Sequence, residues 1–188
     1  PTSLKLIKKK IDCDKMADSI GCALEVGMNV KLNMIMGFPH ETKRHIFETL
    51  SFLKRMALLG VHDVNITCFS PYPGSELYDK LREAGEIAEM DSDYFLMLTG
   101  YTDLRFSYSY SPHFGNRQLT LYRLGGLLMF YALSYLSHPT RVFKLISNLI
   151  QGKQETRLDS ALQGLVSHLR RKKTKLEEAK PTVGVEAV

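Results

Sequence analysis

The pattern of apolar and polar positions divides the chain into an α/β part and a helical part. Residues 4–11 carry apolar side chains at helical spacing, and Asp14 is a suitable N-cap for the helix that follows. From there the spacing of apolar residues predicts helices over residues 14–26, 42–59 and 75–84. It predicts strands between them, over residues 30–36 and 61–69. Strands joined by a helix pair in parallel with a right-handed connection, so this part predicts an α/β arrangement.

The second half of the chain has a different pattern. Residues 94–111 are rich in aromatic side chains and lack a clear period, although 105–110 fit a strand. Helical spacing then returns three times, over residues 118–136, 141–150 and 158–175. We therefore expect four segments. Residues 1–90 form the α/β part, and residues 91–117 form an aromatic-rich connecting segment. Residues 118–178 form a helical extension, and residues 179–188 form a disordered tail.

Composition limits the class of protein and its compartment. The 188 residues are 44% hydrophobic and 24% charged with a net charge of +5, as in ordinary soluble globular proteins. The basic clusters at 8–10 and 170–175 are typical of solvated surface, so we expect no nucleic-acid partner. Cys13, Cys22 and Cys68 match no zinc or iron–sulfur spacing. We expect them to be mostly buried, in a reducing, cytoplasmic compartment, and we expect no metal ligand.

Two loops directly follow the predicted strands and carry the candidate chemistry. Residues 37–42 read Gly-Phe-Pro-His-Glu-Thr, and residues 71–78 read Pro-Tyr-Pro-Gly-Ser-Glu-Leu-Tyr. The carboxyl ends of parallel strands are where α/β proteins form binding sites. Glycine lets a ligand approach the backbone, and the helix that follows presents unpaired N–H groups. The alternative is that both loops are ordinary turns, because Gly and Pro are common in turns.

These two loops, in this order, resemble those of radical S-adenosylmethionine (radical SAM) enzymes. The resemblance is strongest to the subgroup with an N-terminal cobalamin-binding domain, which includes anaerobic magnesium-protoporphyrin ester cyclases and methyltransferases. In that subgroup an apolar fifth strand leads into Gly-Phe-Pro-Gly-Glu-Thr, where this chain has His40 in place of the second glycine. The loop after the sixth strand is Pro-x-Pro-Gly-Thr-x-Leu-Tyr, and Ser75 here keeps the capping hydroxyl. Residues 4–11 are similar to the helix after the fourth strand.

The resemblance implies a fold and a cofactor site. The fold is expected to be α/β, the C-terminal part of a partial (β/α)6 TIM-like barrel followed by a helical C-terminal extension. The cofactor would be S-adenosylmethionine (SAM), with its adenosine portion held by backbone and apolar contacts at two strand ends. The implied cofactor-binding residues are Ile35, Met36, Gly37, Phe38, Pro39, Thr67, Cys68 and Phe69. No catalytic side chain is expected in this segment.

For the full-length enzyme, the resemblance implies reductive SAM cleavage to a 5′-deoxyadenosyl radical, or cobalamin-linked methyl transfer or oxidative cyclisation. The substrate would be a small molecule, and the reductant a protein such as flavodoxin or ferredoxin. The family's Cys-x-x-x-Cys-x-x-Cys loop, which holds a [4Fe-4S] cluster, is absent here, and the chain starts at Pro1. We therefore expect the cluster ligands and any cobalamin domain to lie upstream in a longer protein, and this fragment alone to be inactive.

Two interpretations of other classes stay open. The helices are also compatible with a non-enzymatic interaction module attached to a degenerate α/β piece. Residues 119–150 are compatible with a peripheral membrane protein, because the last helix in this range is amphipathic. The uncharged run at 124–137 is too short to span a bilayer, so a buried helix is the first interpretation.

The remaining polar and aromatic residues have structural interpretations as well as functional ones. His40 and His45 form no metal-site pattern, and exposed or capping roles are expected for both. Glu41 is expected near a helix N-terminus, where a carboxylate is favourable. The aromatic residues of 94–111 are expected either to pack in the core or to close over a substrate, with Arg105 at the surface.

Overall fold

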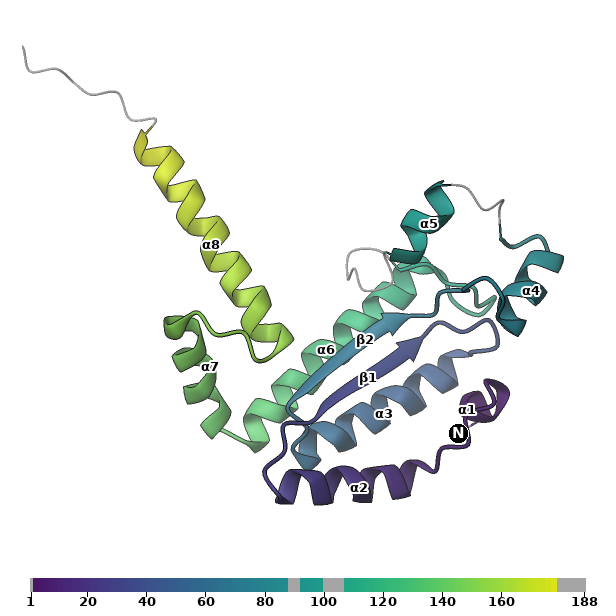
Figure 1. The fold of residues 1–188 in the computed structure, drawn as a ribbon, viewed down its shortest axis with the longest axis horizontal. Helices are drawn as coiled ribbons and strands as arrows, with labels where there is room; N and C mark the ends of the chain where they lie inside the picture. The colour runs from purple at the N-terminus through teal and green to yellow at the C-terminus, as the bar shows by residue number, and fades with distance from the viewer. Residues whose placement is uncertain (1, 88–91, 100–106, 179–188) are drawn as a thin grey trace, which may run out of the picture. The chain divides into compact units, whose positions relative to one another are not determined.

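A computed structural model of the chain describes residues 2–87, 92–99 and 107–178, and the chain forms two compact units, residues 1–138 and 139–188. The first unit contains α1 (Thr2–Leu6), α2 (Cys13–Glu25), β1 (Lys31–Met36), α3 (Lys43–Leu59), β2 (Asp63–Cys68), α4 (Glu76–Glu83), α5 (Ser92–Thr99) and α6 (Asn116–Ser137) (Figure 1). The second unit contains α7 (Thr140–Gln151) and α8 (Arg157–Glu178).

The two strands pair in parallel, with Lys31 opposite Asp63 and Met36 opposite Cys68. The crossover helix between them is α3, so the predicted strand–helix–strand order is confirmed. Because the strands run in the same direction, the loops that follow Met36 and Cys68 leave the sheet at the same edge (Figure 1).

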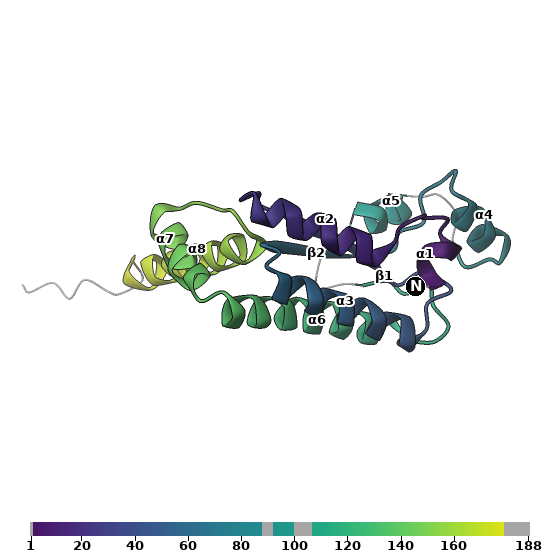
Figure 2. The same cartoon turned by 90° about the horizontal axis from the view of Figure 1, so that it is seen from below.

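One face of the sheet is apolar and covered by helices. The helices α3 and α6 lie side by side on this face (Figure 2) and bury the apolar residues of both strands. The buried strand residues of this core are Leu32, Met36, Val64, Ile66 and Cys68. On the opposite face, β1 leaves Lys31, Asn33 and Ile35 exposed, and Lys31 forms an ion pair with Asp63 (2.9 Å). The alternation of the strand pattern therefore places a polar face opposite the core.

Local hydrogen bonds explain where the helices begin. The side chain of Asp12 accepts hydrogen bonds from the N–H groups of Asp14 (2.9 Å) and Lys15 (3.2 Å). The N-cap of α2 is therefore Asp12, and the prediction of Asp14 is wrong by two residues because either carboxylate suits that role in sequence. At the start of α3, the Thr42 N–H donates to Nδ1 of His45 (3.1 Å), which confirms a capping role for His45.

A fully buried arginine, Arg123 of α6, closes the outer edge of β2. Its Nε and Nη2 atoms donate to the Ile66 carbonyl (3.2 and 3.0 Å), and its Nη1 atom donates to Ser107 Oγ (2.8 Å). The N–H groups of Asp63 and Phe69 point toward β1, so the alternate residue Ile66 directs its carbonyl away from β1. Arg123 thus satisfies a backbone group that a further strand would otherwise use.

Among the described residues, α6 is the one helix that is long and apolar enough to cross a membrane. One side of it packs in the core, where Leu119, Leu127 and Phe130 are buried with the sheet and α3. Its other side exposes Leu121, Leu128 and Leu136. The first interpretation of the uncharged run as a buried helix therefore holds for one side of α6 only. The structure places α6 in the first unit, although the sequence grouped it with the helical extension.

A second apolar cluster covers the loop edge of the sheet. It combines Phe38 and Phe69, from the two loops, with residues of α4, α5 and the segment after α5. The segment 92–99, expected to be irregular, is the helix α5, and residues 107–110 are not a strand. The rest of the predicted strand, at 105–106, and the predicted tail at 179–188 lie outside the described residues.

Two adjacent glycines in α6 give a matched test of the α3–α6 packing. A Cβ added at Gly126 would lie 2.9 Å from Leu50 Cδ2 and 3.1 Å from Ile66 Cδ1, whereas a Cβ at Gly125 would meet nothing within 4 Å. We expect Gly126→Val to lower the free energy of unfolding by about 1–3 kcal/mol through overpacking. Gly125→Val, the same change on the open side of the helix, should raise it by less than about 1 kcal/mol through helix propensity.

Urea unfolding followed by far-ultraviolet circular dichroism measures both changes. Equal effects of the two substitutions would contradict the close packing of α6 on α3 and β2.

Candidate functional site

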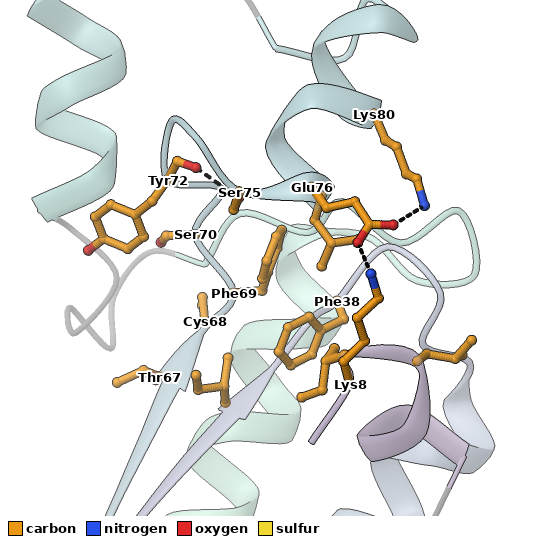
Figure 3. A pocket seen from close by; sticks show the side chains of 14 residues that line it. Lys8, Phe38, Thr67, Cys68, Phe69, Ser70, Tyr72, Ser75, Glu76 and Lys80 are labelled. Atoms are coloured by element: carbon orange, nitrogen blue, oxygen red, sulfur yellow. Dashed lines mark hydrogen bonds and ion pairs between the residues drawn. The ribbon is translucent and has the colours of Figure 1, made fainter. Parts of the chain in front are cut away.

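A cleft of about 520 Å³ lies at the carboxyl ends of β1 and β2 (Figure 3). The strand ends contribute Ile35, Thr67 and Cys68, and the two following loops contribute Phe38 and Phe69. The segment after α1 and the first turns of α4 complete the walls. The parallel pairing described above places all of these elements at one edge of the sheet, as expected for an α/β binding site.

The floor of the cleft is apolar and its aromatic rings are held in place. The ring of Phe38 packs on that of Phe69, with centroids 4.8 Å apart, and Phe69 meets Tyr110 edge-on at 5.8 Å. Next to the rings, Thr67 Oγ1 donates to the Met34 carbonyl (3.1 Å) across the two strands. Ile35 is 46% exposed, so its side chain offers apolar surface to a ligand instead of to the core.

Three charged side chains stand at the rim, where the Glu76 carboxylate lies between the ammonium groups of Lys8 and Lys80 (Figure 3). Lys8 is the main cause of a pKa of about 2 for Glu76, and Lys80 lowers it further. Lys8 lies in the turn after α1 and has a left-handed backbone (φ 58°). The rim therefore presents both signs of charge above an apolar floor.

The loop after β1 is organised by a buried carboxylate, Glu41, which is 2% exposed. Its Oε2 atom accepts hydrogen bonds from the N–H groups of Gly37 (2.7 Å) and Phe38 (3.2 Å). Burial raises the pKa of Glu41, and these two hydrogen bonds oppose that rise. Ser111 Oγ donates to the Glu41 carbonyl (2.6 Å), so the loop is also fixed to the segment before α6. The role of Glu41 seen here is structural, as expected, although it acts on the loop before the helix.

The structure brings together five of the eight residues predicted to hold a cofactor. These five line the cleft: Ile35, Phe38, Thr67, Cys68 and Phe69. Met36, Gly37 and Pro39 do not line it: Met36 is fully buried in the core, and Pro39 is half-buried in the loop. Gly37 has φ 92°, and a Cβ there would lie 2.7 Å from Leu119 Cδ2. A larger residue at Gly37 would therefore disturb the packing of α6, so the position does not test ligand binding cleanly.

The other candidate residues have mostly structural surroundings. Cys68 is buried and Cys13 half-buried, but Cys22 is exposed, so the expectation of burial is wrong for Cys22 because it faces away from the core of α2. In the described ranges, no group of three or more His, Cys, Asp or Glu side chains is placed to hold a metal ion. His40 stacks on Phe38 (5.6 Å between centroids), and burial, with the nearby His45, lowers its pKa.

The aromatic segment packs on the cleft from outside. Tyr94 donates a hydrogen bond to the Pro71 carbonyl, and the ring of Tyr110 supports Phe69. Burial, ahead of its tyrosine and glutamate neighbours, raises the pKa of Tyr110. Of the expected roles, core packing describes these two tyrosines, whereas Arg105 lies outside the described residues.

Sequence reasoning missed the charged rim and Arg123. The spacing of Glu76 and Lys80 by four residues in a helix is a readable signal for their ion pair. The contact of Lys8 with Glu76, 68 residues away, has no local signal, and Arg123 looked like the boundary of an apolar run.

Comparisons with known proteins give a partial match. No protein-family model matches the chain. A protein of Pyrococcus horikoshii, named as an uncharacterized methyltransferase, is 30% identical to the chain over 79 residues. These residues are 42% of this chain and 17% of that protein, so the chain spans a small part of its relative's length. Part of the chain is thus similar to a protein named as an enzyme of methyl transfer.

The two hydrogen bonds to Glu41 predict a clear difference between two substitutions. Glu41→Ala leaves two buried N–H groups without their acceptor and should lower the free energy of unfolding by about 2–4 kcal/mol. Glu41→Gln keeps an oxygen acceptor and should cost less than about half of that. Urea unfolding at neutral pH measures both variants, and equal losses would contradict the role of the carboxylate as an acceptor.

The raised pKa of Glu41 also predicts a pH dependence with a definite sign. Above the ordinary value of 4.5 the folded chain binds more protons at Glu41 than the unfolded chain does. The contribution of Glu41 to the free energy of unfolding is therefore greatest below pH 4.5. It decreases as the pH rises through the raised pKa that Glu41 has in the folded chain. The stability of Glu41→Gln relative to the natural chain should increase over the same range, and a constant difference would contradict the shift.

Proposed function

We propose that residues 1–90 are the last two strand–helix units of a radical SAM barrel, and that the cleft holds the adenosine portion of SAM. The observation that carries the proposal is the cleft itself. It lies at the carboxyl ends of two parallel strands and is lined by Ile35, Phe38, Thr67, Cys68 and Phe69. Its aromatic floor suits a purine ring, and its rim offers both charge signs to the zwitterionic amino-acid portion.

The arrangement of the sheet supports a position at the end of a barrel. Helices cover one face, and the opposite face of β1 is exposed and includes Lys31 and Asn33, as an inward-facing barrel surface would be. The outer edge of β2 is closed by Arg123, which leaves the β1 edge for further strands. This asymmetry suits a terminal strand β2 in a partial (β/α)6 barrel.

The chemistry of the whole protein is the finer part of the proposal. The partial similarity to a protein named as a methyltransferase favours methyl transfer over ring formation for the full-length enzyme, with cobalamin as a further cofactor. The described residues do not fit a [4Fe-4S] cluster, because they contain no set of three ligands for a metal. This chain would therefore contribute the nucleoside-holding wall, and the cluster ligands would come from elsewhere in the protein.

Two equally exposed apolar residues test the cleft. Ile35 lines it, whereas Leu58 of α3 is exposed to a similar extent (46% and 48%) and does not line it. In the full-length protein that contains this chain, we expect Ile35→Arg to weaken SAM binding at least about tenfold, because a charged side chain would occupy the apolar floor. Leu58→Arg makes the matched change outside the cleft and should leave the affinity within about twofold.

Isothermal titration calorimetry with SAM measures both dissociation constants. Equal affinities of Ile35→Arg and the natural protein would overturn the cleft as the SAM site. Formation of 5′-deoxyadenosine from SAM under anaerobic, reducing conditions tests the radical reaction separately. SAM binding without that product would keep the cleft and refute the radical chemistry.

A further inference from the structure

The second unit shows an unusual distribution of polar and apolar side chains, which is the basis of a separate inference. In this unit polar groups are buried where α7 meets the start of α8 and the loop before it. Asn148 Nδ2 donates to Oδ2 of Asp159 (3.2 Å), and both residues are at least 95% buried. The same Asp159 atom accepts the N–H groups of Glu155 and Thr156, and Lys144 pairs with Glu155 (2.7 Å).

Several large apolar side chains of α7 are exposed, whereas Leu145 and Leu149 are half-buried. Phe143 is 75% exposed, Ile146 is 49% exposed and Ile150 is 81% exposed. Their spacing of three and four residues places them on one side of the helix, together with Val142, which is also exposed. We call these four residues the α7 apolar face. A helix of a water-soluble unit normally turns such a face inward, whereas the described residues of the second unit leave this face uncovered.

The charge of the second unit narrows the class of partner. Residues 139–188 contain 10 of the 25 Lys and Arg residues but only 5 of the 20 Asp and Glu residues, so their net charge is +5. Residues 1–138 contain 15 of each kind and are neutral overall. The whole positive charge of the chain therefore lies in the unit that carries the α7 apolar face, and Arg141 and Lys144 are part of α7 itself.

The α7 apolar face and the positive charge of its unit distinguish between three possible partners: a second copy of the chain, a nucleic acid and a lipid surface. A second copy of the chain would bring a second charge of +5 to the same contact, which like-charge repulsion disfavours. A nucleic acid would match the positive charge, but its phosphate backbone would not bury four exposed apolar side chains. An anionic lipid surface matches both, because it takes an apolar helix face into the acyl boundary and attracts basic residues at headgroup level.

We propose that α7 lies on the surface of an anionic lipid bilayer, with the α7 apolar face toward the acyl chains. The helix has 12 residues, too few to cross the hydrocarbon core, so it rests in the interface. The net charge of +5 on residues 139–188 attracts this unit to the anionic headgroups. Binding by α7 would hold the chain at the membrane independently of the cleft in the first unit.

The absence of tryptophan from the sequence allows a direct test. Phe143→Trp places a single fluorophore on the α7 apolar face with little change in character. Phe47→Trp is the matched control, because Phe47 is an exposed phenylalanine (59%) on α3 in the first unit. Phosphatidylglycerol-rich vesicles should shift the emission of Phe143→Trp to shorter wavelength, whereas phosphatidylcholine vesicles should shift it much less. The emission of Phe47→Trp should not change.

Vesicle co-sedimentation of the 188-residue chain gives the second measurement. The double change Phe143→Asp and Ile150→Asp should reduce the bound fraction at anionic vesicles by more than about tenfold. Phe47→Asp should bind as the natural chain does. Retained binding of the double variant, an emission shift at Phe47→Trp, or a natural chain that does not bind anionic vesicles would each overturn the proposal. Concentration-dependent dimerisation without lipid, lost in the double variant, would assign the face to a second copy and also overturn it.

Discussion

The parallel pairing of β1 with β2 is the constraint on which the first unit depends. Parallel strands need a crossover, and the crossover here is α3, which covers the face that holds Met36 and Cys68. The same pairing sends both following loops to one edge, where Phe38 and Phe69 meet. A one-residue shift of this register would exchange the two faces and remove both the core and the cleft.

Two buried charged residues, Glu41 and Arg123, favour one arrangement of the chain around this small sheet over the alternatives. Glu41 fixes the loop after β1 by accepting two N–H groups, and Arg123 occupies a carbonyl on the outer edge of β2. Burying either charge is costly unless its hydrogen-bonding groups are satisfied, so each residue is compatible with few alternative arrangements of the chain. The interior of the first unit therefore combines apolar packing, which supplies most of the stability, with polar contacts that select one geometry.

Much of the fold follows from local sequence, whereas the site follows only in part. Alternating and helical periods predicted both strands and the helices around them, because each period reflects which side of one element is buried. The floor of the cleft was also predictable, since residues such as Ile35 and Phe69 stand at strand ends. The orientation of Gly37 toward α6 and the contact of Lys8 with Glu76 depend on segments far apart in sequence, so no local pattern contains them.

The two apolar clusters of the first unit have a consequence for its motions. Met36 and Cys68 belong to the cluster between the sheet and its helices, whereas Phe38 and Phe69 belong to the cluster with α4 and α5. The boundary between the clusters lies at the cleft, because Phe38 is only two residues after Met36 and Phe69 directly follows Cys68. Local unfolding of the α4–α5 side would therefore open the cleft while the strand pairing stays intact, so entry to the site can cost less free energy than unfolding the core.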